Sequence, residues 1–181
     1  MSNAQNMNDA FDYTEDLRGK LMAAIGDINQ AQADFKPSED LWSLGEVIHH
    51  LTLSETGSFA RLKSLFDGSL EQPTLLGKDG DDNFLAAVAD IAKTGKAPAP
   101  KDIVPTSGKN IQELRDTFDQ VMTDAKVDLS AFENNDLTRC KMPFATFCDL
   151  DGYQWIKFQG AHEARHIQQV EAIKASPGYP A

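Results

Sequence analysis

The sequence of 181 residues predicts an all-α protein, a single domain spanning residues 1–181 with four long helices in a bundle. Three observations lead to this fold class. Apolar residues recur at intervals of three and four in four separate stretches, which is the period of an amphipathic helix. Helix-start and helix-stop residues bound these stretches. A long connection between the second and third stretches indicates a crossover rather than a simple hairpin of helices.

The first predicted helix covers residues 8–33 and ends before Pro37, because proline cannot continue a helix. The second begins after Ser43, since Ser43 and Glu46 have the spacing of a capping box, and it ends near Gly68. We therefore interpret Glu46 as a capping residue and not as a catalytic one.

The connection over residues 69–105 is rich in glycine, proline, aspartate and lysine, which is typical of a loop. It contains one apolar stretch, residues 84–91, that could form a short helix capped by Asp81 or Asp82. The third long helix is predicted over residues 107–125 from its strong helical period.

Residues 126–150 include Pro143 and several β-branched or aromatic side chains. They predict a loop with one or two short extended pieces, such as residues 137–141. The last helix is predicted to start near Asp151 and to end before Pro177.

Composition excludes several classes of protein. A formal net charge of −11 and a pI near 4.7 argue against a nucleic-acid-binding face and against attraction to anionic membranes. The N-terminal residues lack the basic and apolar regions of an export signal, and no stretch is apolar enough to span a membrane. We therefore expect a soluble protein of the reducing cytoplasm. In that setting Cys140 and Cys148 are expected to be free thiols.

Two histidines one helical turn apart carry the functional argument. His162 and His166 lie on one face of the last predicted helix, close enough for both rings to reach one metal ion. With Glu163 they also form the His-Glu-x-x-His string of zinc proteases. Those enzymes usually take a third ligand further along the chain, and no histidine follows His166. We therefore regard the protease match as accidental, while packing or solvent-facing histidines stay an equal alternative for the pair alone.

A third ligand would have to come from upstream, where only His49 and His50 are available. Both lie in the second predicted helix, and periodicity alone does not choose between them. His50 is nearer to the apolar stripe, which favours it modestly.

The chain resembles the DinB-like (DinB/YfiT) family of metalloenzymes through two motifs. The second helix of that family reads W-S-x-x-E-v-x-x-H-L followed by a Glu, and its last helix reads H-x-x-x-H-x-x-Q. The matching positions here are Trp42, Ser43, Glu46, His50, Leu51 and Glu55 in the first motif, and His162, His166 and Gln169 in the second.

The resemblance implies an up-down-down-up bundle, often a homodimer, in which His50, His162 and His166 bind a divalent transition metal, zinc or nickel. It implies that His50 and not His49 is the ligand. Three imidazoles leave a coordination position open, as catalytic sites do. Some members of the family transfer low-molecular-weight thiols such as mycothiol or bacillithiol, and others are proposed hydrolases.

The expected function is therefore that of a metal-dependent thiol transferase or hydrolase acting on a small molecule. The alternative is a metal-stabilised ligand-binding or stress-linked interaction bundle without turnover. No residue is assigned to catalysis. Four residues are near enough to support the ligands or to act as an acid or base, namely Glu55, Glu163, Arg165 and Gln169. Of these, Glu163 and Arg165 are expected instead to be solvated charges on the helix flanks, and Gln169 to support only a ligand or a helix contact. Aromatic side chains could line a pocket but are expected mostly in the core, namely Trp42, Phe144, Phe147, Tyr153 and Trp155.

Overall fold

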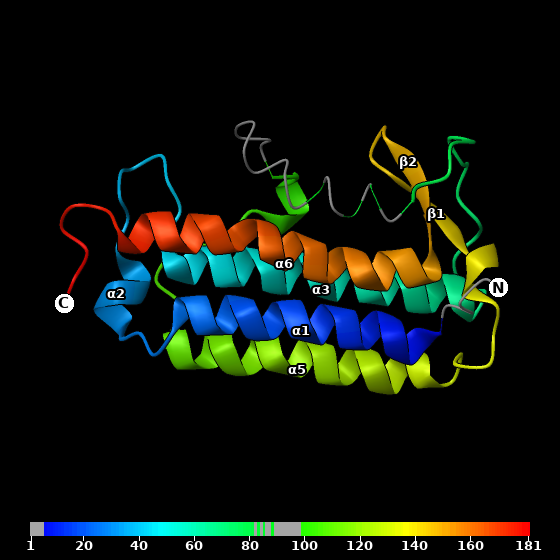
Figure 1. Cartoon of the computed structure of the whole chain (residues 1–181), viewed down its shortest axis with the longest axis horizontal. Helices are drawn as coiled ribbons and strands as arrows, with labels where there is room; N and C mark the ends of the chain where they lie inside the picture. The colour runs from blue at the N-terminus through cyan, green and yellow to red at the C-terminus, as the bar shows by residue number, and fades with distance from the viewer. Residues whose placement is uncertain (1–5, 82, 84, 86–87, 89–98) are drawn as a thin grey trace.

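The structure is a computed structural model that describes residues 6–81, 83, 85, 88 and 99–181. In this part of the chain, long helices lie side by side and short elements close the ends (Figure 1). The long helices are α1 (Met7–Ile25), α3 (Leu44–Phe66), α5 (Ile111–Ser130) and α6 (Gly152–Lys174). The short elements are α2 (Gln30–Asp34), the 3-10 helices η2 (Lys101–Ile103) and η3 (Leu137–Arg139), and the strands β1 (Lys141–Phe144) and β2 (Cys148–Asp151). The predicted all-α class is confirmed, with a small sheet added.

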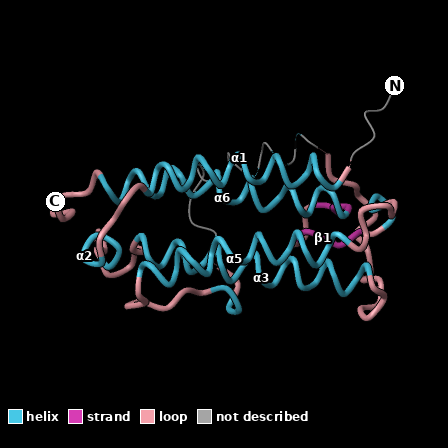
Figure 2. Tube along the Cα trace, turned by 90° about the horizontal axis from the view of Figure 1, so that it is seen from below, coloured by secondary structure: helices cyan, strands magenta, loops and turns pink. Residues whose placement is uncertain are grey.

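The long helices pack as two close pairs. Helix α1 lies mainly against α6, and α3 lies mainly against α5 (Figure 2). Contacts between α3 and α6 join the two pairs. All four long helices contribute buried side chains to the core.

The first helix is shorter than predicted. Helix α1 ends at Ile25 because Gly26 takes a left-handed φ of 66°, and the chain restarts as α2 behind a capping box made by Asn29 and Gln32. The single helix predicted over residues 8–33 was therefore wrong at its C-terminal end. The apolar period continues through the break, which is why periodicity did not reveal it.

The other helix starts follow their caps. Ser43 and Glu46 form the predicted capping box of α3, and Asp151 and Gln154 form another at the start of α6. Helix α5 begins four residues later than predicted, because the side chain of Asn110 caps it by accepting hydrogen bonds from the backbone N–H groups of Gln112 and Glu113. The helix continues to Ser130.

Two short extended pieces were predicted within residues 126–150, and the structure has two short strands there, which form a β-hairpin before α6. Strands β1 and β2 pair antiparallel, with Met142 opposite Leu150. The extended piece predicted over residues 137–141 is a 3-10 helix for most of its length. Both strands have only four residues, too few for alternation to stand out in the sequence.

The hairpin also fixes the beginning of the long connection. The carboxylate of Asp149 accepts hydrogen bonds from the backbone N–H groups of Leu76 and Gly77, at 2.9 and 2.7 Å. Backbone bonds between Asp149 and the chain on either side of Asp79 extend the hairpin by one parallel bridge. The beginning of the connection is thus tied to β2.

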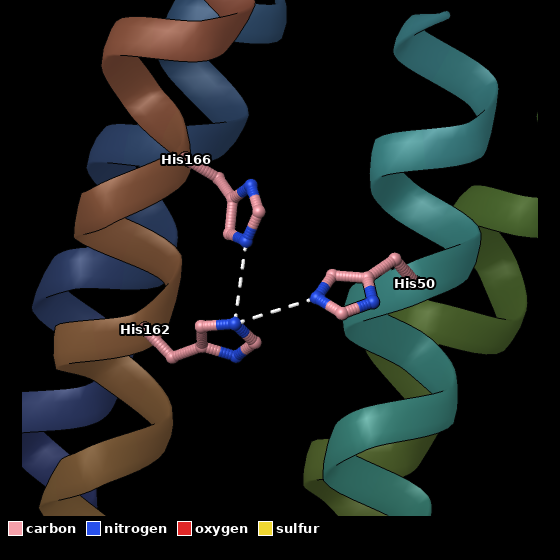
Figure 3. A group of neighbouring side chains, drawn as sticks. All are labelled: His50, His162 and His166. Carbon is pink, nitrogen blue, oxygen red and sulfur yellow. Dashed lines mark hydrogen bonds between the residues drawn. The ribbon is translucent and has the colours of Figure 1, made fainter. Parts of the chain in front are cut away.

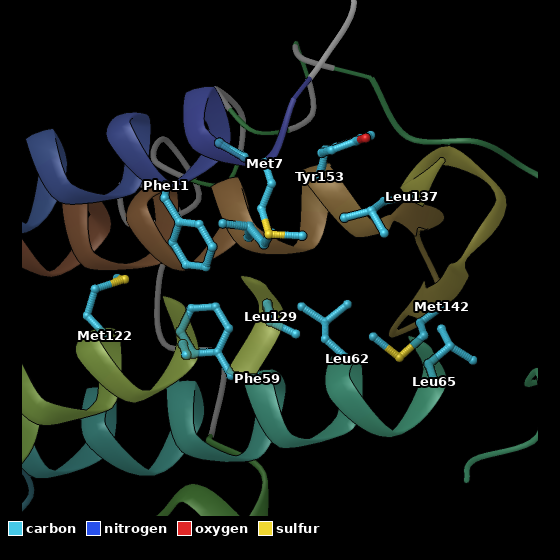
Figure 4. Packing of buried hydrophobic residues seen from close by; sticks show 13 residues of the cluster. Met7, Phe11, Phe59, Leu62, Leu65, Met122, Leu129, Leu137, Met142 and Tyr153 are labelled. Atoms are coloured by element: carbon cyan, nitrogen blue, oxygen red, sulfur yellow. The ribbon is translucent and has the colours of Figure 1, made fainter. Parts of the chain in front are cut away.

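Of three apolar clusters among the described residues, two lie toward opposite ends of the long helices and are separated by a layer of polar side chains. Figure 4 shows one cluster at the hairpin end, where Met7, Phe59, Met142 and Tyr153 pack together from different elements. The other cluster, around Phe118, lies at the α2 end. Buried polar side chains occupy the helix positions between them, namely Thr14, Arg18, Thr52, Ser54, Glu55, Gln159, His162, Glu163 and His166.

Three further expectations concern the rest of the chain. The short helix predicted over residues 84–91 falls largely outside the described residues. Cys140 and Cys148 are free thiols, as predicted. Among the described residues, no helix is both long and apolar enough to cross a membrane.

Candidate metal centre

Three imidazole rings meet at the polar layer. His50 comes from α3, and His162 and His166 come from successive turns of α6 (Figure 3). Nε2 of His162 lies 3.4 Å from Nε2 of His50 and 3.2 Å from Nε2 of His166. All three rings are buried, and one nitrogen from each lies within 4.8 Å of the others. The structure thus brings together the three histidines predicted as metal ligands.

Hydrogen bonds on the outer side of two rings orient their inner nitrogens. Nδ1 of His50 lies 2.8 Å from the carbonyl oxygen of Ile103, and Nδ1 of His166 lies 2.8 Å from Oε1 of Gln169. Because these oxygens can only accept, each Nδ1 donates and each neutral ring keeps a lone pair on Nε2. Two lone pairs are therefore directed at His162, whose own Nδ1 has no partner among the described residues.

This arrangement fits a metal ion better than it fits a proton. A proton on Nε2 of His162 can be donated well to only one of its two neighbours, which leaves the other lone pair unsatisfied. Three nitrogens about 2.0–2.1 Å from a tetrahedral zinc ion lie about 3.3–3.4 Å apart. The two short Nε2 separations here are 3.2 and 3.4 Å. The three side chains therefore suit a site with three imidazole ligands.

The surroundings keep the rings neutral, as metal ligands must be. Burial lowers the pKa of His50 and, together with the neighbouring rings, lowers the pKa of His162 well below its usual range. Burial and the nearby His50 lower the pKa of His166 to about 3. The charge of Arg165 acts in the same direction on all three rings.

His49 serves a different purpose. Its Nδ1 accepts a hydrogen bond of 3.0 Å from the backbone N–H of Thr106. The neighbouring Ser107 donates to Glu46 at 2.6 Å, and Ile103 accepts from His50. Glu46, His49 and His50, near the start of α3, therefore hold the last residues of the long connection against this helix. The choice that periodicity left open between His49 and His50 is settled in favour of His50 as the ring in the cluster.

Aromatic rings surround the cluster on two sides. The ring of Trp42 lies 4.7 Å from that of His50, and Phe158 stacks on His162 with 8° between the ring planes. Phe158 also contacts Phe144 and Trp155, which continue the apolar surface toward the hairpin. Of the predicted aromatic residues, Tyr153 is plain core, whereas Trp42 packs directly on a cluster histidine and Phe147 is 53% exposed.

Glu163 was expected to be a solvated charge, and this prediction was wrong. Its side chain is fully buried on the side of α6 that faces α1, where Arg18 donates to it from Nε at 3.1 Å and from Nη2 at 2.9 Å. Arg18 also pairs with Glu55 of α3 and donates to the carbonyl oxygen of Phe118 on α5. One guanidinium therefore connects all four long helices.

The two carboxyl groups also contact each other. Each group affects the ionisation of the other, and Oε1 of Glu55 and Oε2 of Glu163 have no hydrogen-bond partner among the described residues. Burial and the charge of Glu55 raise the pKa of Glu163 well above its usual range, while Arg18 opposes this shift. Burial also raises the pKa of Glu55. The two buried carboxyl groups thus pair with the same arginine.

Sequence reasoning missed Arg18 and Ile103. A usable signal existed for Arg18, because Thr14, Arg18, Leu21 and Ile25 follow the apolar period of the first helix. An arginine in such a stripe needs a buried partner. Ile103 acts through its backbone carbonyl, so no sequence pattern could have indicated it. Gln169 takes the supporting role considered for it.

Comparison with known proteins places these residues in a family. A family model described as the DinB superfamily matches residues 13–170, a range that contains every residue of the histidine and carboxylate clusters. The uncharacterized protein YuaE of Bacillus subtilis (strain 168) is 29% identical over 143 residues, covering 77% of this chain and 81% of the relative. No solved structure matches the chain.

Proposed function

The chain belongs to the DinB superfamily, and from this premise we propose that it is a metal-dependent transferase that activates a low-molecular-weight thiol. One observation carries the proposal. Three buried, neutral imidazoles direct their nitrogens at one point, with spacings that suit zinc or nickel. A bound ion would supply Lewis acidity, which lowers the pKa of a thiol at the open coordination position.

The residues of the chain prepare the site for this chemistry. Ile103 and Gln169 fix the ring orientations of His50 and His166, so that the ligands need no rearrangement. Trp42 and Phe158 cover the flanks of the cluster with apolar surface. Water is thereby kept from the flanks, which favours a sulfur nucleophile over competing hydrolysis.

The position of Glu163 favours thiol transfer over hydrolysis. In a zinc protease the glutamate of His-Glu-x-x-His acts as the general base for water. Here that carboxylate faces α1 and is held by Arg18, and no described carboxylate joins the histidine cluster. A metal ion held by the three histidines would lower the pKa of a thiol enough that no such base is needed. Transfer then consists of sulfur attack on an electrophilic carbon, departure of its leaving group and release of the thiol proton to solvent.

The proposal extends to the organisation of the protein. We infer that the four long helices run up-down-down-up in one domain and that two copies form a homodimer, as the resemblance implies. We also infer a cytoplasmic location, where low-molecular-weight thiols are abundant. The free thiols of Cys140 and Cys148 are consistent with a reducing compartment.

The test begins with metal content, measured by inductively coupled plasma mass spectrometry on tag-free protein. Wild type and His49→Ala should carry about one equivalent of zinc or nickel, while His50→Ala and His162→Ala should carry little. His49→Ala is the matched control because His49 is adjacent to His50 but binds Thr106. No metal in wild type, even after loading with zinc or nickel, would refute a metalloenzyme.

Turnover is tested separately on the loaded protein. We expect it to accelerate the reaction of a small thiol with an electrophile such as 1-chloro-2,4-dinitrobenzene, and we expect His162→Ala to abolish the acceleration. Stoichiometric metal without acceleration across a panel of thiols and electrophiles would favour the alternative, a metal-stabilised bundle that binds ligands without converting them.

A further inference from the structure

Arg165 is a half-buried cation that has no counterion in the part of the chain that the structure describes. It lies on α6, three residues after His162 and next to His166, so its side chain starts from the same turn as the cluster. Among the described residues it has neither a hydrogen bond nor an ion pair. The other arginines that are at least partly enclosed do have partners, since Arg18 binds two carboxyl groups and Arg115 donates to the carbonyl oxygen of Gly26 at 2.6 Å.

This lack of a partner is unusual for the composition of the protein. The chain has 28 acidic residues and 17 lysines and arginines, so a carboxylate would be the common neighbour of any cation. The buried carboxyl groups of the polar layer, Glu55 and Glu163, are bound to Arg18. Partial burial also disfavours the charge of Arg165, because its pKa is lowered by desolvation. A guanidinium held in this state lacks the anion that would compensate for its lost hydration.

The charge of the loaded site leads to the same conclusion. The three ligands are neutral imidazoles, so they do not offset the two positive charges of a divalent ion. Arg165 adds a third positive charge, which is close enough to act on all three rings. No carboxylate of the described chain joins the cluster. An anionic ligand would balance this excess, and a thiolate alone supplies only one negative charge.

We propose that Arg165 is a specificity-determining residue that binds a carboxylate of the thiol ligand while the sulfur of that ligand occupies the three-histidine site. The substrate class is thus a small thiol that also bears a carboxylate. The planar fork of a guanidinium matches a carboxylate with two parallel hydrogen bonds. Side chains three apart on a helix are about 5–6 Å apart at Cβ, so a ligand with two or three carbons between sulfur and carboxylate can contact both. This inference rests on the proposed function, because it assumes a metal at the cluster.

The test compares two probes that differ only in charge. Cobalt(II)-loaded protein is titrated with 3-mercaptopropionate and with its neutral amide, 3-mercaptopropionamide, and binding is followed by the sulfur-to-cobalt charge-transfer band in the near ultraviolet. Wild type should bind the carboxylate at least about tenfold more tightly than the amide, the size expected for a hydrogen-bonded charge pair. Arg165→Gln should bind both probes equally, with the affinity for the amide unchanged.

Two further variants separate the proposed contact from a general effect of charge. Arg61→Gln removes an exposed arginine on α3 that lies eleven residues after His50, roughly 16 Å along the helix axis. It should keep the full preference for the carboxylate. Arg165→Lys keeps the charge but loses the fork, so it should retain only part of the preference.

The outcomes are distinguishable. Loss of the preference in Arg165→Gln but not in Arg61→Gln supports the assignment. An unchanged preference in Arg165→Gln, or none in cobalt-loaded wild type, overturns it and leaves the metal site intact. Failure of wild type to take up cobalt, read from the absence of its visible absorption bands, refutes the proposed function and this inference with it.

Discussion

Arg18 is the residue on which the polar layer depends most. Its guanidinium forms ion pairs with both Glu55 and Glu163 in the middle of the core. Burial by itself would lower the pKa of Arg18, but the two glutamates outweigh this effect and raise it. Removing one member of a buried ion group leaves its partners charged and poorly hydrated, which costs more than the group as a whole contributes.

We therefore predict that Arg18→Met lowers the free energy of unfolding by about 3–5 kcal/mol. Urea denaturation followed by circular dichroism measures this loss. Arg61→Met, on the surface of α3, is the control and should change stability by less than about 0.5 kcal/mol. Adding Glu55→Gln to Arg18→Met should recover part of the loss. Equal stability of the two single variants would contradict the role given to Arg18.

His166 gives the metal-free protein a pH dependence of defined sign. In the unfolded chain it ionises near 6.5, whereas in the folded protein burial lowers its pKa to about 3. Between these two pKa values the unfolded state binds more protons than the folded state, so the free energy of unfolding decreases as the pH falls. Glu163 acts oppositely, because its raised pKa makes stability fall as the pH rises above the ordinary range of a carboxyl group.

Comparison with His166→Gln isolates the histidine contribution. Between pH 7 and pH 5, in the presence of a chelator, wild type should lose stability more steeply than the variant. The difference should be at most about 1.4 kcal/mol per pH unit, which is the value for one proton. Parallel stability curves for the two proteins would show that the ring is not held neutral in the fold.

The sequence predicted which residues form the site more easily than it predicted which helix each side chain faces. Periodicity found the pair on α6 and the resemblance found His50, because these depend on spacing within one helix. The same spacing could not reveal that Glu163, one residue after His162, faces a different helix. Its partner Arg18 lies 145 residues earlier in the chain. Only the packing of α1 against α6 makes that contact.

The contact between α1 and α6 is close at one glycine. A Cβ atom built on Gly160 would lie 2.8 Å from Cα of Thr14, which is backbone and cannot rotate away. The hydroxyl of Thr14 also donates across this interface to the carbonyl oxygen of Ile156 at 2.9 Å. The two helices therefore approach each other at the level of the polar layer because residue 160 has no side chain.

Gly160→Ala should accordingly lower stability by about 1–3 kcal/mol through overpacking. Gly19→Ala is a matched control, since a Cβ atom at that helical glycine of α1 would meet nothing within 4 Å. It should raise stability by about 0.5–1 kcal/mol, because alanine favours a helix over glycine. Thermal denaturation of both variants beside wild type measures the contrast. Two changes of the same sign would argue against the close approach.

Among the elements, those with a chemical start signal were predicted best. The capping residues Ser43 and Asp151 marked the starts of α3 and α6. The end of α1 was missed because nothing in the apolar pattern changes at Gly26. Two short extended pieces before α6 were predicted, but their positions and their pairing as a hairpin were not, because the two strands are short and only partly alternating.

For the molecule as a whole, a bound metal would join α3 to α6 across the core. Only the folded state assembles the three histidines, so binding stabilises it by about 2.7 kcal/mol at an ion concentration one hundred times the dissociation constant. For a protein of this size that corresponds to a rise of roughly 5–10 °C in melting temperature. We expect this rise with zinc or nickel in wild type and His49→Ala, measured by scanning calorimetry. The same rise in His162→Ala would place the ion elsewhere.

The long connection is held at both ends by different parts of the molecule. Asp149 holds Leu76 and Gly77 at its beginning, while His49 and His50 hold Thr106 and Ile103 at its end. Neither attachment depends on the number of residues between them. The length of this segment can therefore change without disturbing the histidine cluster or the hydrogen bonds that hold its rings.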